Sequence, residues 1–397
     1  MAHSPIRILF GAYQTRHLSN GGMESATRIF EGLRDRFDWM LLTTREMPRT
    51  QRWRKGKAKV AITPFDEEGS KWARRFAGLR WNAAFARAEK SFRPGLVHLN
   101  DIQSYQAYAF AHLPGSKPPL VFTLRDTTPP GQPYSPIWSK LARDAERIVV
   151  LSEEMGAELT RKLPAATGKI EVINSIVDLQ NFAPPSDEER VSARRRLGIG
   201  EHEFAIGCIG AIREKKGQLA FVRDALPSIL ADHPDAKLHF VGDAGDRTDP
   251  YWIEFERAIA DPAVRNAVEV HGHQDDMALW FKALDLVLIA ANHEGLARAM
   301  IEGMASGVAV VSTDVCSARE MLEPTGAGIV VERGDWPALR GAVSRMRDDE
   351  FRAGCGRKGR ETAQRLFDET IVVDRFAKLY EEIGGRHAAK EDRRAQR

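Results

Sequence analysis

The chain has 397 residues, more than one ordinary hydrophobic core accommodates, so two domains are expected. Hydrophobic residues make up 43% and charged residues 28%, and the formal net charge of +3 argues against nucleic acid as a partner held by overall charge. No apolar run reaches the roughly eighteen residues of a membrane span, and the three cysteines lack the spacing of a metal site or a disulfide framework. We therefore expect a soluble, cytoplasmic protein.

Short aliphatic segments alternate with helical segments through the first half of the chain. The predicted strands cover residues 6–13, 95–101, 119–126, 146–153 and 169–178. A glycine turn at Gly21 and Gly22 follows the first strand and precedes an amphipathic helix. Such a turn lets backbone N–H groups approach an anion, although it is about as often a simple tight turn.

Two basic segments follow the glycine turn. Residues 45–59 contain seven Lys or Arg, one Glu and Trp53, and residues 71–87 contain five more basic residues and no acid. Trp72, Phe76 and Leu79 share one face of the predicted second helix. Two interpretations stay open: a solvated basic face over ordinary core contacts, or a surface formed by residues 45–87 that binds anionic lipid.

The strand–helix alternation restarts after a connection that contains two prolines and a charged helix. Predicted strands of the second half cover residues 203–212, 236–246, 267–274, 284–291, 308–314 and 326–335. The predicted domains are residues 1–180 and 181–368, followed by a helix at 369–397 that returns to the first domain and ends in a basic, disordered tail. Both halves indicate α/β domains with parallel sheets, whose carboxyl ends are expected to face an interdomain cleft.

Basic residues follow the first strand of the second half. Arg213, Lys215 and Lys216 form either a solvated loop or a clamp for phosphate groups. The chain lacks the GxxxxGK[ST] loop of nucleoside triphosphatases, and the strand itself carries G-x-x-G rather than the dinucleotide pattern G-x-G-x-x-G.

Two glutamates occur in the segment ANHEGLARAMIEGMASGVAVVSTD at residues 291–314. Glu294 lies in a polar turn after a predicted strand, and Glu302 lies in an apolar helix that is predicted to end at Gly307. Most glutamates in such proteins lie at the surface. A carboxylate in a buried helix is costly without partners, so Glu302 favours contact with a ligand.

This segment resembles the E-x7-E motif of the retaining glycosyltransferases of family 4. Four further segments resemble that family: NGGMESA, VINSIVDLQNF, GAIREKKG and HFVGDAG, and a fifth, TDVCSAREML, carries another glutamate, Glu320. The resemblance covers almost the whole chain and implies the GT-B fold, with two Rossmann-like domains.

The resemblance also implies roles for individual residues. Glu294 would contact the donor sugar, Glu302 the ribose hydroxyls of the nucleotide, and Arg213 with Lys216 the departing diphosphate. The other donor-binding residues implied are Gly21, Gly22, Gly242, His293, Gly295, Leu296 and Ala297. The family uses neither a cofactor nor a metal ion.

Several positions depart from the family pattern. The family's phosphate-binding arginine falls at Ala211, so Arg213 would take its place. The family's His-Asp pair is Arg125-Asp126, which leaves Arg125 as a donor contact and any base role to Asp126. His98 is a further candidate for a sugar contact, although a lone histidine is more often structural.

The predicted function is metal-independent, retaining transfer of a hexose from a nucleotide-sugar donor. UDP is favoured over GDP, and the acceptor is expected to be a glycolipid or surface-polysaccharide precursor that faces the cytoplasm, reached from the inner face of the plasma membrane. Two alternatives share the fold: a nucleotide-sugar 2-epimerase and a non-catalytic nucleotide-sugar-binding protein.

Overall fold

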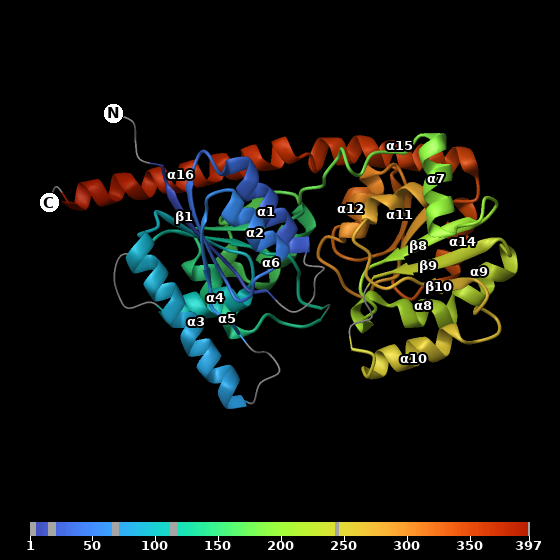
Figure 1. The fold of residues 1–397 in the computed structure, drawn as a ribbon, viewed down its shortest axis with the longest axis horizontal. Coiled ribbons are helices and arrows are strands. Elements are labelled where there is room, and N and C mark those ends of the chain that lie inside the picture. Colours follow the sequence, from blue (N-terminus) through green and yellow to red (C-terminus); the bar gives the residue numbers. More distant parts are fainter. Residues whose placement is uncertain are drawn as a thin grey trace. The chain divides into compact units, whose positions relative to one another are not determined.

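The structure is a computed structural model that describes residues 5–14, 21–65, 71–111, 117–129, 131–242 and 246–395. The chain folds into two compact units. Unit 1 comprises residues 1–176 and 369–397, and unit 2 comprises residues 177–368. Each unit is a parallel sheet flanked by helices (Figure 1).

Unit 1 contains seven parallel strands in the order β3-β2-β1-β4-β5-β6-β7. The strands are β1 (Arg7–Ala12), β2 (Asp38–Thr43), β3 (Lys59–Ile62), β4 (Leu96–Leu99), β5 (Leu120–Thr123), β6 (Arg147–Val150) and β7 (Ile170–Val172). The helices are α1 (Gly21–Leu33), α2 (Pro48–Lys55), α3 (Lys71–Phe92), α4 (Ile102–Ala111), α5 (Pro136–Asp144), α6 (Glu153–Lys162), the 3-10 turn η1 (Pro164–Ala166) and α16 (Glu369–Ala395).

The strand order of unit 1 reverses between β1 and β4. The chain builds outward from β1 to β3 on one side and from β4 to β7 on the other. Central strands such as β4 and β5 are buried at every residue, which explains their unbroken aliphatic runs. In open sheets of this kind, ligands bind beyond the carboxyl ends of the strands at the point of reversal.

Helix α16 completes the hydrophobic core of unit 1. Phe376 and Tyr380 are buried together with side chains of β1 and α1. The helix continues through Ala395, whereas a disordered tail was predicted from the sequence. Beyond Gly384 and Gly385 the residues are mostly Ala, Lys, Glu and Arg, which are strong helix formers and extend the helix past the two glycines.

The basic segment at residues 45–59 packs against α1 instead of forming a uniform surface. It contains α2, and Trp53 of this helix is fully buried. The Trp53 ring stacks on Phe30 with centroids 4.2 Å apart, and its Nε1–H donates to Thr27 Oγ1 at 3.0 Å. Trp53 therefore cannot belong to a lipid-binding surface.

Arginines of α2 form ion pairs with α1. Arg52 lies 3.0 Å from Glu24 Oε1 and 2.5 Å from Glu31 Oε2, and Arg49 Nε donates to Glu24 Oε2 at 2.9 Å. Burial alone would raise the pKa of Glu24, but hydrogen bonds from Arg49 and Arg52 and their charges lower it to about 2. Arg52 thus holds α2 on α1 and is not a free surface charge.

Replacing Glu24 by glutamine is expected to destabilise the protein more at pH 7 than at pH 3. The pKa of Glu24 falls from 4.5 to about 2 on folding, so its stabilisation is present above pH 4.5 and is lost as the pH falls toward 2. The shift corresponds to at most about 3 kcal/mol, which solvent screening at this partly exposed site reduces. Urea unfolding of the parent and Glu24→Gln at both pH values measures the difference, and an equal loss at pH 7 and pH 3 would contradict this origin.

Unit 2 contains six parallel strands in the order β10-β9-β8-β11-β12-β13. The strands are β8 (Phe204–Ile209), β9 (Ala236–Val241), β10 (Val268–Val270), β11 (Leu286–Ile289), β12 (Ala309–Thr313) and β13 (Gly328–Val331). The helices are α7 (Asp187–Leu197), α8 (Gln218–Asp224), α9 (Leu226–Asp232), α10 (Pro250–Ile259), α11 (Met277–Ala283), α12 (Arg298–Ala305), α13 (Ala318–Leu322), α14 (Trp336–Arg345) and α15 (Asp349–Leu366), with the 3-10 turn η2 (Glu214–Lys216).

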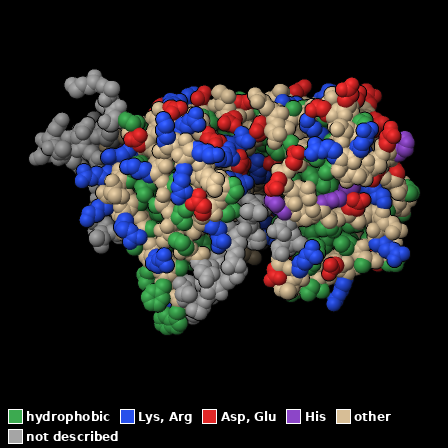
Figure 2. All heavy atoms as spheres, viewed as in Figure 1, with side chains coloured by type: hydrophobic (Ala, Val, Ile, Leu, Met, Phe, Trp, Pro, Cys, Tyr) green, Lys and Arg blue, Asp and Glu red, His purple; other side chains and the backbone are tan. Residues whose placement is uncertain are grey.

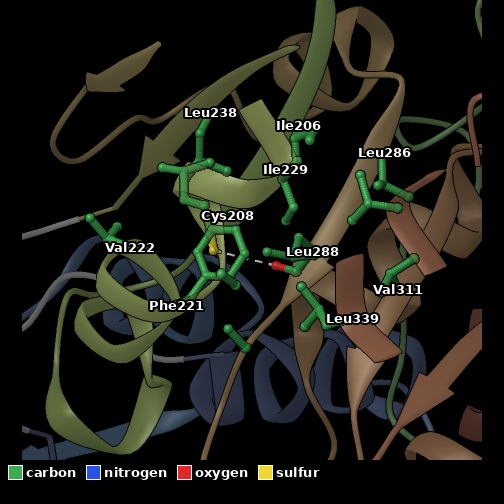
Figure 3. Packing of buried hydrophobic residues seen from close by; sticks show 14 of the residues in the cluster. Ile206, Cys208, Phe221, Val222, Ile229, Leu238, Leu286, Leu288, Val311 and Leu339 are labelled. Atoms are coloured by element: carbon green, nitrogen blue, oxygen red, sulfur yellow. Dashed lines mark hydrogen bonds between the residues drawn. The ribbon is translucent and has the colours of Figure 1, made fainter. Parts of the chain in front are cut away.

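One hydrophobic cluster of unit 2 lies between its sheet and helices that include α8, α9, α10 and α14. Figure 3 shows side chains of β8, β9, β11 and β12 meeting Phe221 of α8, Ile229 of α9 and Leu339 of α14. Cys208 lies in this core and donates its Sγ–H to the carbonyl oxygen of Leu288 at 3.5 Å. Burial raises the pKa of this thiol to about 12, so Cys208 acts as a core residue rather than a nucleophile.

Local sequence signals explain the ends of several elements. Ser186 caps α7 in a reciprocal pair with Glu189, and Gly198 ends the helix with a positive φ of 74°. Gly307 follows α12 with a φ of 70°, as the sequence predicts. Strands β2 and β3 were not predicted. Across the described ranges, no helix combines the length and the apolarity needed to cross a membrane.

Candidate active site

The residues that the sequence singles out in unit 2 lie where its strand order reverses. β8 pairs with β9 on one side and β11 on the other, and one loop follows each of β8 and β11. The loop after β8 carries Arg213 and Lys216, and the loop after β11 carries Glu294. The N–H of Asn292 donates to the carbonyl oxygen of Lys215 at 2.8 Å and joins the two loops. Together they form one polar surface beyond the strand ends.

Lys216 and Glu294 form an ion pair on this surface. Lys216 Nζ lies 2.7 Å from Glu294 Oε1, and the two side chains are 22% and 10% exposed. Lys215 Nζ lies 4.0 Å from the same oxygen but is 45% exposed. A shielded carboxylate needs a charged partner, which Lys216 supplies. The pair offers a cation for an anionic group and, beside it, a carboxylate for hydroxyls or developing positive charge.

Three glycines let the backbone pack closely beneath this pair. A Cβ on Gly242 would overlap the carbonyl oxygen of Gly210, and a Cβ on Gly217 would overlap that of Ala290. A Cβ on Gly210 would lie 3.4 Å from Lys216 Nζ. Gly242 therefore allows the ends of β8 and β9 to meet, and Gly210 leaves room for the Lys216 side chain.

Glu302 lies on α12, a helix whose residues 299–305 are all buried. Its Oε1 accepts hydrogen bonds from Arg298 Nε at 3.0 Å and from Arg298 Nη2 at 2.6 Å. Arg298 stands four residues earlier, one helical turn away, and its side chain is 28% exposed. The structure thus gives the buried carboxylate one charged partner that also reaches solvent.

The remaining predicted residues of unit 2 lie in or near the segments that follow β8, β11 and β12. Arg213 is exposed and precedes η2. The N–H of His293 donates to the carbonyl oxygen of Lys215 at 3.2 Å, and the carbonyl oxygen of Gly295 accepts from Ser317 Oγ at 3.2 Å. Leu296 and Ala297 are buried between the loop and α12. Glu320 lies in α13, which follows β12.

In unit 1, polar residues also gather where the strand order reverses. Arg125 follows β5, and its Nε donates to Asn100 Oδ1 after β4 at 3.0 Å. Asp101 Oδ2 accepts from the N–H of Tyr13, after β1, at 2.8 Å. Asp126 is partly buried and accepts from the N–H of Thr127 at 3.1 Å. Unit 1 thus has its own polar surface at the carboxyl ends of its central strands.

The glycine turn of unit 1 is only partly described. Gly21 and Gly22 are the first two residues of α1, and Ser25 Oγ donates to the carbonyl oxygen of Gly21 at 3.2 Å. Residues 15–20, which precede these two glycines, lie outside the described residues.

His98 is a core residue and not a sugar contact. It is fully buried in β4, with Nδ1 2.6 Å from Tyr380 Oη and Nε2 2.7 Å from Thr123 Oγ1. Burial lowers its pKa to about 3, so the ring stays neutral. Both ring nitrogens have partners inside unit 1, and the prediction of a sugar contact is wrong.

Three residues of the two polar surfaces were not predicted from the sequence: Arg298, Asn100 and Asn292. The i, i+4 spacing of Arg298 and Glu302 was visible and could have indicated their pairing. The roles of Asn100 and Asn292 depend on contacts between separate loops, with Arg125 and Lys215 respectively, which no local pattern reveals.

Two models of protein families match the chain and together cover most of it. Residues 20–174 match the family described as glycosyl transferase 4-like domain, and residues 203–349 match glycosyl transferases group 1. The first match lies in unit 1 and the second in unit 2.

Curated relatives are similar at modest identity. The chain is 27% identical over 252 residues to the lipopolysaccharide core biosynthesis mannosyltransferase LpsB of Rhizobium meliloti, covering 62% of this chain and 68% of the relative. It is 28% identical over 232 residues to a GDP-mannose-dependent monoacylated alpha-(1-6)-phosphatidylinositol monomannoside mannosyltransferase of Corynebacterium glutamicum, covering 55% and 58%. The matches thus span about half to two thirds of these relatives.

Solved structures share the fold along nearly the whole chain. A glycosyltransferase from Rickettsia africae superposes with a TM-score of 0.78 at 17% identity, covering 96% of this chain and 99% of that one. HepE of Anabaena, solved in complex with UDP and glucose, gives a TM-score of 0.78 at 20% identity, covering 95% and 100%. These likenesses establish the two-sheet architecture as that of solved glycosyltransferases.

Proposed function

The chain belongs to the group 1 glycosyltransferases, a retaining family with the GT-B fold, and from this premise we propose that it transfers a sugar from a nucleotide-sugar donor to an acceptor hydroxyl. The Lys216–Glu294 ion pair at the strand reversal of unit 2 carries the proposal. In the transition state of sugar transfer, negative charge develops on the leaving diphosphate and positive charge on the sugar ring. A cation placed at the diphosphate and a carboxylate placed at the sugar stabilise that transition state.

The proposed roles follow from that chemistry. Lys216, with the exposed Arg213, stabilises the departing diphosphate, and Glu294 holds the sugar near its reacting carbon. Glu302 accepts hydrogen bonds from the ribose hydroxyls. Because the Lys216 ammonium lies 2.7 Å from Glu294 Oε1, we propose that this side-chain cation acts on the diphosphate in place of a metal ion, so turnover is expected to be equal with and without EDTA.

The proposed donor carries a hexose on UDP, and the proposed acceptor is a glycolipid or surface-polysaccharide precursor. The LpsB relative acts in lipopolysaccharide core biosynthesis, which supports an acceptor of this class. The Corynebacterium relative depends on GDP-mannose, so guanosine is the alternative base. Mass spectrometry of nucleotide that copurifies with the protein distinguishes the two.

Turnover assays test the reaction itself. Purified protein is incubated with UDP-glucose, UDP-N-acetylglucosamine or GDP-mannose, with and without lipid-linked saccharide, and release of the nucleotide diphosphate is measured. Acceptor-dependent release is the expected result. Conversion of a donor into its epimer without acceptor would support the epimerase alternative, and tight nucleotide binding without turnover would support a binding protein.

Helix α3 presents an exposed apolar face that suits a lipid surface. Trp72, Phe76 and Leu79 are 68%, 64% and 62% exposed, while Trp81 and Phe85 anchor the other face in unit 1. Figure 2 shows hydrophobic side chains at the surface where Figure 1 draws the first turns of α3. The Arg75 guanidinium lies 5.4 Å from the Trp72 ring centroid, so a cation accompanies this face. We propose that it contacts anionic lipid near the acceptor.

Replacing Trp72, Phe76 and Leu79 together by serine is expected to weaken binding to anionic vesicles at least about tenfold, because each buried apolar side chain contributes over 1 kcal/mol. Vesicle flotation at low and high salt measures this, and the parent's binding is expected to fall as salt rises. Val191→Ser, at a 54% exposed position of α7 in unit 2, is the matched control and should bind like the parent.

The basic residues near α2 provide a second test of the lipid surface. Arg54, Lys55 and Lys57 are exposed and suit replacement by glutamine, whereas Arg52 must be kept because it holds α2 on α1. If the parent protein does not bind anionic vesicles at low salt, the proposed lipid surface is wrong. A soluble saccharide would then be the favoured acceptor.

A further inference from the structure

The edge of the sheet in unit 2 brings together three side chains that none of the roles above uses. β10 is the edge strand and lies beside β9 (Figure 1). In the parallel pairing of these two strands Glu269 lies opposite His239. Side chains of a strand alternate between the two faces, so His271, two residues after Glu269, returns to the same face. The register of two strands therefore gathers two imidazoles and one carboxylate.

The ligand atoms of these residues lie at the spacing of a metal site. His239 Nδ1 is 3.0 Å from His271 Nε2, and Glu269 Oε2 is 3.6 Å from His271 Nε2 and 3.9 Å from His239 Nδ1. The circle through three points at these separations has a radius of about 2 Å, which matches Zn–N and Zn–O bonds of about 2.0–2.2 Å. An ion could therefore bind all three atoms with little movement of the side chains.

A second carboxylate orients the buried histidine. Glu203 Oε1 lies 2.6 Å from His239 Nε2, and this hydrogen bond places the proton on Nε2 and leaves the lone pair of Nδ1 directed at the cluster. Carboxylates commonly hold metal-binding histidines in this way. The Trp280 ring packs on His271 with centroids 4.4 Å apart and restricts the orientation of that imidazole.

The cluster is open to solvent on one side. The His239 side chain is 1% exposed, that of His271 18% and that of Glu269 49%, so an ion can enter past Glu269 and keep water as a further ligand.

We propose that His239, Glu269 and His271 form a binding site for one divalent transition-metal ion of the zinc class. Two imidazoles and one carboxylate suit Zn²⁺ and its neighbours rather than Mg²⁺ or Ca²⁺, which prefer oxygen ligands. The bound ion links edge strand β10 to β9 and stabilises unit 2. It takes no part in the proposed sugar transfer, which relies on Lys216 and Glu294.

Isothermal titration of untagged, EDTA-treated and dialysed full-length protein with ZnCl₂ tests the site. Saturable binding of one ion per chain is expected, together with a rise in the melting temperature, because an ion that binds the folded state stabilises it. MgCl₂ is expected to produce neither effect. Co²⁺ is expected to give a visible absorption band that His271→Ala abolishes.

Variants distinguish this site from other histidines. His271→Ala and Glu269→Gln should each weaken zinc binding at least about tenfold, since even outer-shell partners contribute 10- to 100-fold. Glu269→Gln changes an exposed side chain, and melting in EDTA verifies that both variants fold. The matched control is His273→Ala, two residues further along the same loop and outside the cluster. Absence of saturable zinc binding below about 100 µM, or equal affinity in the parent and both variants, would overturn the proposal.

Discussion

Replacing Lys216 by alanine is expected to lower turnover of the sugar donor about 10²-fold, with a smaller effect on donor affinity. Lys216 Nζ lies 2.7 Å from Glu294 Oε1 and beside Gly210, at the carboxyl end of β8. Its charge acts on the leaving diphosphate most strongly when negative charge develops there, so its loss should appear in kcat. Steady-state kinetics with saturating acceptor measures both constants.

Lys215→Ala is the matched control for this prediction. Lys215 is the adjacent residue and carries the same charge, but its Nζ is 4.0 Å from Glu294 and its side chain is 45% exposed. Solvent screens an exposed charge, so turnover is expected to change less than about threefold. Equal losses in Lys215→Ala and Lys216→Ala would indicate a general electrostatic effect of the loop and would remove Lys216 from its proposed position at the diphosphate.

Glu294→Gln separates the two members of the ion pair. Glutamine keeps the shape of the side chain but not its charge, so the nucleotide diphosphate should bind as in the parent while turnover falls. Thermal melting must accompany the kinetics, because Lys216 loses its charged partner in this variant. Turnover equal to that of the parent would remove Glu294 from the sugar site.

The parts of the fold that the sequence predicts are those with strong local patterns. β11, α12 and β12 follow from two aliphatic runs and a small-residue segment that ends at Gly307. The candidate site follows from the same unit, since residues after β8 and β11 meet wherever a doubly wound sheet reverses its strand order.

The parts that the sequence did not predict depend on contacts between distant elements. The pattern of residues 45–59 left open a solvated basic face over core contacts or a lipid-binding surface, and it could not show that Glu24 and Phe30 of α1 fix Arg52 and Trp53. From the sequence, His98 was a polar residue near the end of a strand. Its hydrogen-bond partner Tyr380 lies 282 residues later in the chain, so no local pattern could reveal the pair. Such partners are determined by tertiary packing, which overrides local preference.

Glu302→Ala is expected to weaken nucleotide diphosphate binding about 10- to 150-fold, because hydrogen bonds to a charged acceptor contribute about 1.5–3 kcal/mol. Glu302 is 8% exposed, and its Oε1 is held by Arg298 at 2.6 Å, so the carboxylate is already fixed in one orientation before a ligand arrives. A fixed acceptor loses little conformational entropy on binding, which favours the upper part of this range.

A deoxynucleotide isolates the ribose contact from any general damage to α12. The parent should bind 2′-deoxy-UDP, or the deoxy form of whichever nucleotide copurifies, more weakly than the ribonucleotide. Glu302→Ala should discriminate much less between the two, since the acceptor for the missing hydroxyl is itself gone. Calorimetric titration of both proteins with both ligands completes a thermodynamic cycle. It yields the coupling free energy between the Glu302 carboxylate and the ribose hydroxyl.

Arg298→Ala tests whether Arg298 only orients the Glu302 carboxylate or also contacts the nucleotide. If Arg298 acts only by orienting the carboxylate, its removal should weaken binding by less than Glu302→Ala and should preserve the preference for the ribonucleotide. If Arg298→Ala removes the preference for the ribonucleotide, Arg298 is needed to hold Glu302 in its binding orientation. If the affinity falls as much as in Glu302→Ala and by the same factor for the ribonucleotide and the deoxynucleotide, the Arg298 guanidinium contacts the phosphates, because a phosphate contact does not depend on the ribose hydroxyl. Unchanged nucleotide affinity in Glu302→Ala would show that Glu302 does not bind the ribose, and its burial beside Arg298 would then be a structural feature of α12 alone.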